Sequence, residues 1–528
     1  MARGQHQHRW CRSARRMLAS MVRRATSICS ISRRRWRHGC MRGLGRLSSA
    51  AWLCAALLAL VPVRADAIGQ PPGGAADAGA VRRLIGIEYA QAGRWEAPRD
   101  VAPFARPELG RLPPRCPQSV TGLASGSERE DCLYLNVVLP LAPLNGAKPL
   151  PVYVYVHGGG ATAGSANDHD GTRLALATGA AVVSINYRLG HLGFLAGLPG
   201  ARGNYALLDV LSALRWVHAA APRLGLDATN ITLGGESAGG TVVCALLAMP
   251  QAAGLFQRAI ISSDDCLHDV DDADQASRRA ADLLARTNCP DLACLRALPP
   301  AAIVKAGGGA APTVQEDGPL PRLPIDQIHT GRWLRTPLLI GANAEEGRII
   351  GPSVTTWTEQ QMRAWLTTVA GPDRAQRIAQ RYADVGAGRR YPVAERMSAI
   401  LTDSGMRGLG GCTILDAARS AALTAPVHFY EYQGTGSAPD SERFATGAAH
   451  AAELPLLWDP PGPPDAGLLA QWRRFIRGEP LAWPPLGEQE TMYVFGTEPH
   501  PIPVTDYTQR HRCAFWHASP PLMPRGDL

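Results

Sequence analysis

The sequence predicts an α/β fold, in which helices cover both faces of a mostly parallel central sheet. β-rich apolar runs alternate along the chain with segments of helical periodicity, and this strand–helix–strand alternation favours a parallel sheet. The 528 residues are 46% hydrophobic and 19% charged, a globular composition that allows a large core. The body of the chain contains no internal repeat and no linker that divides it. We therefore expect one large α/β domain.

The strands of this sheet are predicted from β-branched and aromatic runs. The clearest are Val152–Val156 and Ala180–Tyr187. Three shorter strands are expected at Ile231–Leu233, Pro337–Gly341 and Val427–Tyr432.

Helices are predicted between and around these strands. Residues 205–221 separate the second strand from the third, and their apolar positions fall on one helical face. This face is made of Leu207, Val210, Leu211, Leu214 and Val217. Arg- and Ala-rich helical patterns at 274–299 and 358–384 are interpreted as insertions around the sheet.

The N-terminal region has the pattern of a secretory signal peptide, which we assign to residues 41–67. A short basic segment begins at Met41, the fourteen-residue apolar run Ala50–Val63 follows, and Ala65–Ala67 offers an A-x-A cleavage site. Fourteen apolar residues are few for a transmembrane helix, and an uncleaved anchor is the alternative.

The remaining boundaries follow from this assignment. Residues 1–40 would make the basic part of a signal peptide far too long, so we interpret them as an extended or wrongly assigned N-terminus. Small residues at 68–80 predict a flexible linker, and residues 81–528 form the folded body.

The formal net charge of +9 comes from the N-terminal region. Of the 54 Lys and Arg residues, 14 lie in residues 1–65, which contain no acidic residue. The rest of the chain holds 40 basic and 45 acidic residues, a net charge of −5. A mildly acidic body argues against nucleic acid or an acidic membrane as a partner.

Eight of the 12 cysteines lie outside the targeting region: Cys116, Cys132, Cys244, Cys266, Cys289, Cys294, Cys412 and Cys513. An exported protein reaches an oxidising compartment, so short-range disulfides are expected. No C-x-x-C pair or His/Cys cluster has zinc-like spacing, and we predict no metal site.

The segment GESAG, Gly235 to Gly239, is the one G-x-S-x-G match in the chain. It follows the short strand Ile231–Leu233 and precedes the helical segment Ala238–Met249. A strand–turn–helix of this kind lifts a serine hydroxyl out at the edge of a sheet, where it acts as a nucleophile. The sequence therefore predicts Ser237 as the nucleophile.

A serine nucleophile needs a base, and the base needs an acidic partner. In this strand–turn–helix class the order along the chain is serine, acid, histidine. GANAEEG supplies Glu346 as the acid, with Glu345 as the alternative, and GAAHAAEL supplies His450 as the base.

The segment HGGG, His157 to Gly160, follows the strand Val152–Val156. Consecutive glycines let backbone N–H groups approach a developing oxyanion, together with the N–H of the residue after the nucleophile. A plain glycine turn is the alternative, and the order of all four motifs at strand ends disfavours it.

These motifs resemble the type-B carboxylesterase/lipase family, the cholinesterase-like branch of the α/β-hydrolase fold. The resemblance covers about residues 84–516. Its longer matching segments are EDCLYLNV, INYRLGHLGFL, GNYALLDVLSALRWV, NITLGGESAGG, GLFQRAIISS and GANAEEG.

The resemblance implies a serine carboxylesterase that forms an acyl-enzyme on Ser237, with Glu346 and His450 completing a triad. The signal-peptide pattern adds the expectation that this enzyme is exported, either secreted or periplasmic. It implies no cofactor, and its partner would be a small-molecule ester. Its oxyanion hole would be lined by Gly159, Gly160 and Ala238. Ser263 resembles a family serine that supports the triad, although an ordinary loop serine is the alternative.

The resemblance also implies three disulfides: Cys116–Cys132, Cys289–Cys294 and Cys412–Cys513. We expect the two remaining cysteines, Cys244 and Cys266, to be free thiols.

Departures from the family bear on the substrate. The fifteen residues between Cys116 and Cys132 hold no aromatic, so a choline cation has no obvious cation–π partner. Ala161 stands where an aromatic usually follows the glycines, and Asp264 stands where glycine usually follows the supporting serine. A broad carboxylesterase is favoured over a cholinesterase. The alternatives are a lipase for long acyl chains and a catalytically silent binding or adhesion protein.

Overall fold

The computed structural model describes residues 81–119, 126–141, 148–267, 269–309, 311–405, 409–434, 444–458, 466–487 and 489–518, all within one compact unit of the chain. The predicted segments 1–40, 41–67 and 68–80 lie outside the described residues, and their boundaries stay predictions.

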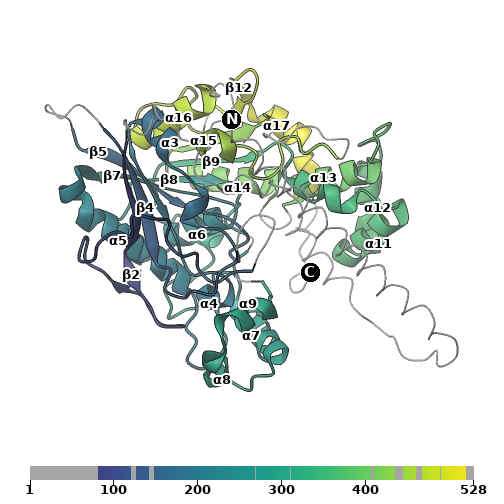
Figure 1. Ribbon diagram of the computed structural model, residues 1–528. Helices are drawn as coiled ribbons and strands as arrows, with labels where there is room; N and C mark the ends of the chain where they lie inside the picture. Colours follow the sequence, from purple (N-terminus) through teal and green to yellow (C-terminus); the bar gives the residue numbers. More distant parts are fainter. Residues whose placement is uncertain are drawn as a thin grey trace, which may run out of the picture. The chain divides into compact units, whose positions relative to one another are not determined.

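A sheet of ten strands forms the centre of this unit (Figure 1). Its spatial order is β1 (Val81–Glu88), β4 (Tyr134–Pro140), β6 (Ala181–Ile185), β5 (Leu150–Val156), β7 (Leu226–Glu236), β8 (Arg258–Ser262), β9 (Leu338–Asn343), β10 (Val427–Tyr432), β11 (Thr491–Phe495) and β12 (His500–Pro503). The strands from β6 to β11 pair in parallel, and antiparallel pairs occur at the two edges. A separate two-stranded sheet pairs β2 (Ala90–Gln91) with β3 (Arg99–Asp100).

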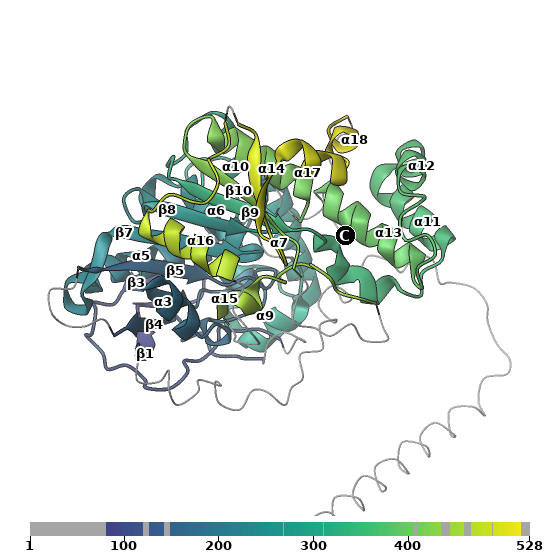
Figure 2. The ribbon, with the colours of Figure 1, turned by 90° about the horizontal axis from the view of Figure 1, so that it is seen from above.

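Alternation along the strands divides the core between the two faces of the sheet. In β5, Val152, Val154 and Val156 pack in one apolar cluster, while Tyr153 and Tyr155 pack in another. The valine face is covered by α5 (Tyr205–Leu224), α6 (Ala238–Leu247), α10 (Pro324–His329), α14 (Gly411–Ala422) and α17 (Val504–Arg510). The tyrosine face is covered by α3 (Thr172–Thr178), α15 (Leu454–Trp458) and α16 (Ala466–Arg477), as Figure 2 shows for α3 and α16. The predicted fold class is confirmed.

Two helical groups with apolar cores of their own flank the sheet. The first contains α4 (Gly190–Phe194), α7 (Ala273–Thr287), α8 (Leu292–Ala297) and α9 (Pro300–Ala306). The second contains the 3₁₀ helix η5 (Glu346–Val354) with α11 (Glu359–Ala370), α12 (Pro372–Arg381), α13 (Pro392–Ser404) and α18 (Cys513–His517). Short 3₁₀ helices also occur at η3 (Ala166–Asp168) and η4 (Pro250–Ala252).

All five predicted strands are present, with shifted ends. The strand predicted at Ile231–Leu233 is the eleven-residue β7, because Gly234 and Gly235 continue the pairing with β5 up to the serine motif. The helical patterns at 274–299 and 358–384 are each two helices. Asn288 ends α7 in a left-handed conformation (φ 53°), and Gly371 (φ 77°) followed by Pro372 separates α11 from α12. No helix among these described residues is long and apolar enough to cross a lipid bilayer.

Candidate active site

Ser237 occupies a strained turn between β7 and α6. Its φ of 56° and ψ of −129° are a backbone conformation that L-residues rarely adopt. The neighbouring glycines make this turn possible. A Cβ at Gly235 would lie 2.3 Å from the Gly239 carbonyl oxygen, and a Cβ at Gly239 would lie 2.1 Å from the Val156 oxygen. These glycines therefore allow Ser237, which is half-buried, to lie at the carboxyl end of the central strand β7.

His450 and Glu346 meet directly. Nδ1 of His450 lies 2.6 Å from Oε2 of Glu346, and both side chains are buried. Glu346 begins η5, shortly after the end of β9, and His450 precedes α15. Glu345 faces elsewhere, because its carboxylate pairs with Arg348 at 2.6 Å and accepts the Ala448 N–H at 3.1 Å. Of the two candidate acids, Glu346 is the one that contacts the imidazole.

The other nitrogen of the imidazole faces Glu236, the residue before Ser237. Nε2 of His450 lies 3.2 Å from Oε1 of Glu236, and this oxygen has no hydrogen-bond partner. Among the described residues, no hydrogen bond joins Ser237 to His450. The imidazole is therefore held between two carboxylates, beside the serine turn.

The glycine run after β5 passes close to the serine. A Cβ at Gly158 would lie 3.1 Å from Ser237 Cβ and 2.6 Å from Glu236 Oε2. Gly159 (φ 103°) and Gly160 (φ 61°) then turn the backbone in a way that favours glycine. Ala238 is the first residue of α6, so its N–H has no acceptor within the helix. These are the three N–H groups that the sequence predicts around an oxyanion.

A buried polar network surrounds Glu346, the predicted acid. Oε1 of Glu346 accepts hydrogen bonds from the Ser263 hydroxyl at 2.6 Å and from the Asn343 backbone N–H at 2.7 Å. The Asn343 side-chain amide donates to the same oxygen at 3.2 Å and to Oε2 of Glu453 at 2.8 Å. Ser263 thus contacts Glu346, and its role as a support of the triad stays a prediction.

Three buried carboxylates surround one imidazole, and this arrangement shifts the pKa values of Glu236, Glu453 and His450. Burial raises the pKa values of Glu236 and Glu453, and the charge of His450 opposes this rise at both carboxyl groups. Burial lowers the pKa of His450, but the charges of Glu236 and Glu346 outweigh it and raise that pKa to about 10. The site therefore stabilises an imidazolium, the charged form that a general base reaches when it takes up a proton.

Comparison with known proteins identifies the chain. Residues 71–516 match the carboxylesterase family. The chain belongs to this family. It is 31% identical over 405 residues to fumonisin B1 esterase of Sphingopyxis macrogoltabida, a match that covers 68% of this chain and 71% of the relative. It is 28% identical over 490 residues to human cocaine esterase, covering 79% of this chain and 86% of the relative.

The fold comparison agrees with the family. A thermophilic pNB esterase structure superposes with a TM-score of 0.67 at 26% identity, covering 82% of this chain and 96% of that one. The central sheet and its helices are the α/β-hydrolase fold, and the carboxylesterase is a serine hydrolase of carboxylic ester bonds.

Three residues near the imidazole of this carboxylesterase were missing from the predicted site: Glu236, Asn343 and Glu453. Each lies inside one of the sequence motifs GESAG, GANAEEG and GAAHAAEL. Glu236 is inside GESAG, Asn343 is three residues before Glu346, and Glu453 is three residues after His450. Strand and helix periodicity cannot show that an acid or amide inside a motif points inward.

The eight cysteines of the folded body form four disulfides among the described residues. Three are the pairs that the resemblance implies: Cys116–Cys132, Cys289–Cys294 and Cys412–Cys513. The fourth joins Cys244 to Cys266, with their Cα atoms 5.2 Å apart. The expectation that both are free thiols is wrong, because α6 packs against the loop after β8, where Thr241 and Gly240 meet Asp264, and this brings the two sulfurs together.

One group of three close metal-binding side chains occurs in the described part of the carboxylesterase: Cys244, Asp264 and Cys266. The two sulfurs are bonded to each other, so they are not available as thiolate ligands.

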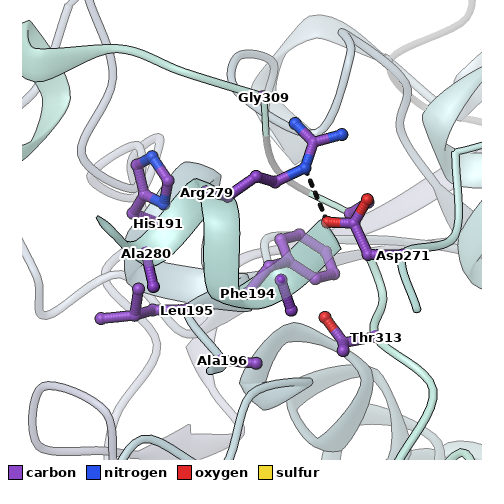
Figure 3. A pocket seen from close by; sticks show the side chains of 11 residues that line it. His191, Phe194, Leu195, Ala196, Asp271, Arg279, Ala280, Gly309 and Thr313 are labelled. Carbon is purple, nitrogen blue, oxygen red and sulfur yellow. Dashed lines mark ion pairs between the residues drawn. The ribbon is translucent and has the colours of Figure 1, made fainter. Parts of the chain in front are cut away.

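A small pocket lies between α4, α7 and the segment before Thr313 (Figure 3). Arg279 reaches over it to pair with Asp271 at 2.7 Å. Its volume of about 10 Å³ is room for about one water molecule, so it does not hold a substrate.

Proposed function

We propose that Ser237, His450 and Glu346 hydrolyse carboxylic esters through an acyl-enzyme intermediate. The observation that carries the proposal is the 2.6 Å contact between His450 and Glu346 beside the strained Ser237 turn. In this assignment Glu346 orients the imidazole through Nδ1, which leaves Nε2 to exchange a proton with the serine hydroxyl.

The reaction follows from these positions. His450 removes the hydroxyl proton while Ser237 attacks the ester carbonyl, and the N–H groups of Gly159, Gly160 and Ala238 receive the oxyanion. His450 then gives the proton to the leaving alcohol. A water molecule, deprotonated by His450, then attacks the acyl-enzyme and releases the carboxylic acid product from Ser237. For Nε2 to serve the hydroxyl, the imidazole must leave its contact with Glu236 during the cycle.

The substrate is a small-molecule ester of a class that the triad alone does not define. Relatives named for fumonisin B1, cocaine and para-nitrobenzyl esters support a family in which acyl and alcohol groups vary widely. Ala161 beside the glycine run is small, which supports acceptance of bulky groups there. We therefore propose a broad carboxylesterase.

We also propose that the protein is exported, to the periplasm or the medium. The four disulfides among the described residues support this, since disulfides persist in oxidising compartments.

The test is hydrolysis of p-nitrophenyl esters from acetate to palmitate by the wild type and by Ser237→Ala. We expect wild-type turnover on short and medium chains, and a loss of several orders of magnitude in the variant. An optimum at palmitate would support the lipase alternative. Absence of wild-type turnover on every ester would support a silent binding protein.

A further inference from the structure

The end of β8 and the loop that follows it, residues 262–266, connect the proposed nucleophile to the proposed acid. The Ser237 N–H donates to the Ser262 carbonyl at 3.0 Å, so the loop begins at the serine turn. The next residue, Ser263, has a φ of 58° and donates its hydroxyl to Glu346. A displacement of this loop would therefore move the hydrogen bond that Glu346 receives.

Asp264 fastens the same loop to α6. Its buried carboxylate accepts a hydrogen bond from the Thr241 hydroxyl at 2.7 Å through Oδ2, and from the Cys266 N–H at 2.9 Å through Oδ1. The loop also lies against the helix backbone, because a Cβ at Gly240 would lie 2.8 Å from Asp264 Cβ. Burial and the neighbouring Asp265 raise the pKa of Asp264 well above its ordinary value.

The disulfide between Cys244 and Cys266 adds a covalent link at the end of the loop. Cys244 is seven residues after Ser237 on α6, and both sulfur-bearing residues are fully buried. Its Sγ lies 3.3 Å from Oδ1 of Asp264, so the carboxylate and the disulfide form one contact. A disulfide that closes 22 residues would stabilise the fold wherever it lay in the chain. Stability alone does not require this placement between nucleophile and acid.

We infer that Cys244–Cys266 and Asp264 form a positioning clamp, which holds Ser263, and through it Glu346, in register with Ser237. The inference rests on the proposed function, because it assigns the clamp to that triad. None of the three clamp residues touches the reacting atoms. Their effect is on the alignment of Glu346 with His450.

The first test removes the Cys244–Cys266 disulfide as Cys244→Ala/Cys266→Ala. The control is Cys289→Ala/Cys294→Ala, which removes the disulfide between the α7–α8 turn and α8. Turnover of p-nitrophenyl acetate is measured per active site, counted by titration with a phosphorylating inhibitor. We expect kcat of the clamp variant to fall about 10-fold or more, since a misplacement of about 1 Å can cost roughly 100-fold. The KM of the clamp variant and the kcat of the control variant should both stay within about twofold of the wild-type values.

The pH profile supplies the readout that a stabilising disulfide would not change. The charge and hydrogen bond of Glu346 raise the pKa of His450, so a loosened Glu346 lowers it. The acid limb of kcat/KM then moves to lower pH in the clamp variant and stays in place in the control variant.

A second pair of variants, both at Asp264, keeps the disulfide and tests the clamp if the first variant does not fold. Asp264→Ala removes both hydrogen bonds of the carboxylate, whereas Asp264→Asn keeps an oxygen for Cys266 and an amide for Thr241. We expect the alanine variant to lower kcat about 10-fold and the asparagine variant to restore it to within about threefold.

Failure of the clamp and failure of the proposed function give different outcomes. Folded clamp variants with wild-type kcat and an unmoved acid limb, but a lower melting temperature, would overturn the clamp and leave the proposed function intact. A folded wild type without esterase turnover would overturn both, because the clamp would then have no triad to position.

Discussion

Glu236 Oε1 lies 3.2 Å from His450 Nε2, on the opposite side of the imidazole from Glu346. This geometry places the residue before the proposed nucleophile, Ser237, in contact with the nitrogen that exchanges a proton with Ser237 in the proposed mechanism. The carboxylate therefore has two consequences: it stabilises the imidazolium, and it competes with Ser237 for Nε2. Both consequences depend on the charge of Glu236.

Glu236→Gln should move the acid limb of the kcat/KM profile to lower pH. The Glu236 charge raises the pKa of His450, and the neutral imidazole is the form that acts as base. Removing the charge lowers that pKa, so the base form appears at lower pH. The measurement is kcat/KM on p-nitrophenyl acetate across the pH range, with the exposed Glu490→Gln as control. An acid limb at the wild-type position in Glu236→Gln would show that the carboxylate does not act on His450.

The two adjacent acids should separate clearly in activity. Glu346→Gln leaves the shape of the side chain but loses the carboxylate that accepts from Nδ1, and we expect kcat to fall roughly 10³–10⁴-fold. Glu345→Gln loses an ion pair with Arg348 and no contact with the imidazole, so kcat should stay within a few-fold. Equal losses in the two variants would contradict the assignment of Glu346 as the acid.

The parts of the site that the sequence predicts are those that carry a local pattern. The Ser237 turn is predictable because Gly235 and Gly239 are required on either side of it, and the strand before it is β-rich. Parallel strands such as β5 and β10 are predictable because valines and aromatics concentrate in them.

What the sequence does not show depends on packing between distant segments. Cys244 and Cys266 are 22 residues apart, and only the packing of α6 against the loop after β8 brings them together. Asn343 and Glu453 are 110 residues apart, and their side chains meet because β9 and β10 are parallel neighbours that lead out of the sheet at the same edge. Edge strands such as β1 and β12 were not predicted, because β1 includes charged residues and β12 includes two prolines.

Gly239→Ala should destabilise the fold as well as the site. A Cβ at this position would lie 2.1 Å from the Val156 carbonyl oxygen, which belongs to a central strand and cannot move without shifting β5. We expect a loss of about 1–3 kcal/mol in the free energy of unfolding, as for overpacked cores. Gly487→Ala is the matched control, because a Cβ there meets nothing within 4 Å. Urea unfolding measures both, and equal stabilities of the two variants would contradict the close packing of α6 on β5.

His511 should make the stability of the fold depend on pH. Its Nδ1 lies 2.8 Å from Asp403 and its Nε2 lies 2.7 Å from Glu431, in a buried cluster that joins α13 to β10. Arg510 pairs with Glu431, and Arg512 and Tyr382 contact Asp403. Burial lowers the pKa of His511, but the hydrogen bonds and charges of Asp403 and Glu431 outweigh it and raise that pKa to about 9.

A histidine whose pKa is raised on folding stabilises the native state fully below its unfolded pKa of about 6.5, and this stabilisation is lost as the pH rises through about 9. Wild type should therefore lose up to roughly 3 kcal/mol more than His511→Gln between pH 6.5 and 9.5. Urea unfolding at the two pH values, with disulfides intact, measures the difference. His450 also has a raised pKa, but it is present in both proteins, so its contribution cancels. Equal losses of stability in the two proteins would show that His511 is not protonated between its two carboxylates in the native fold.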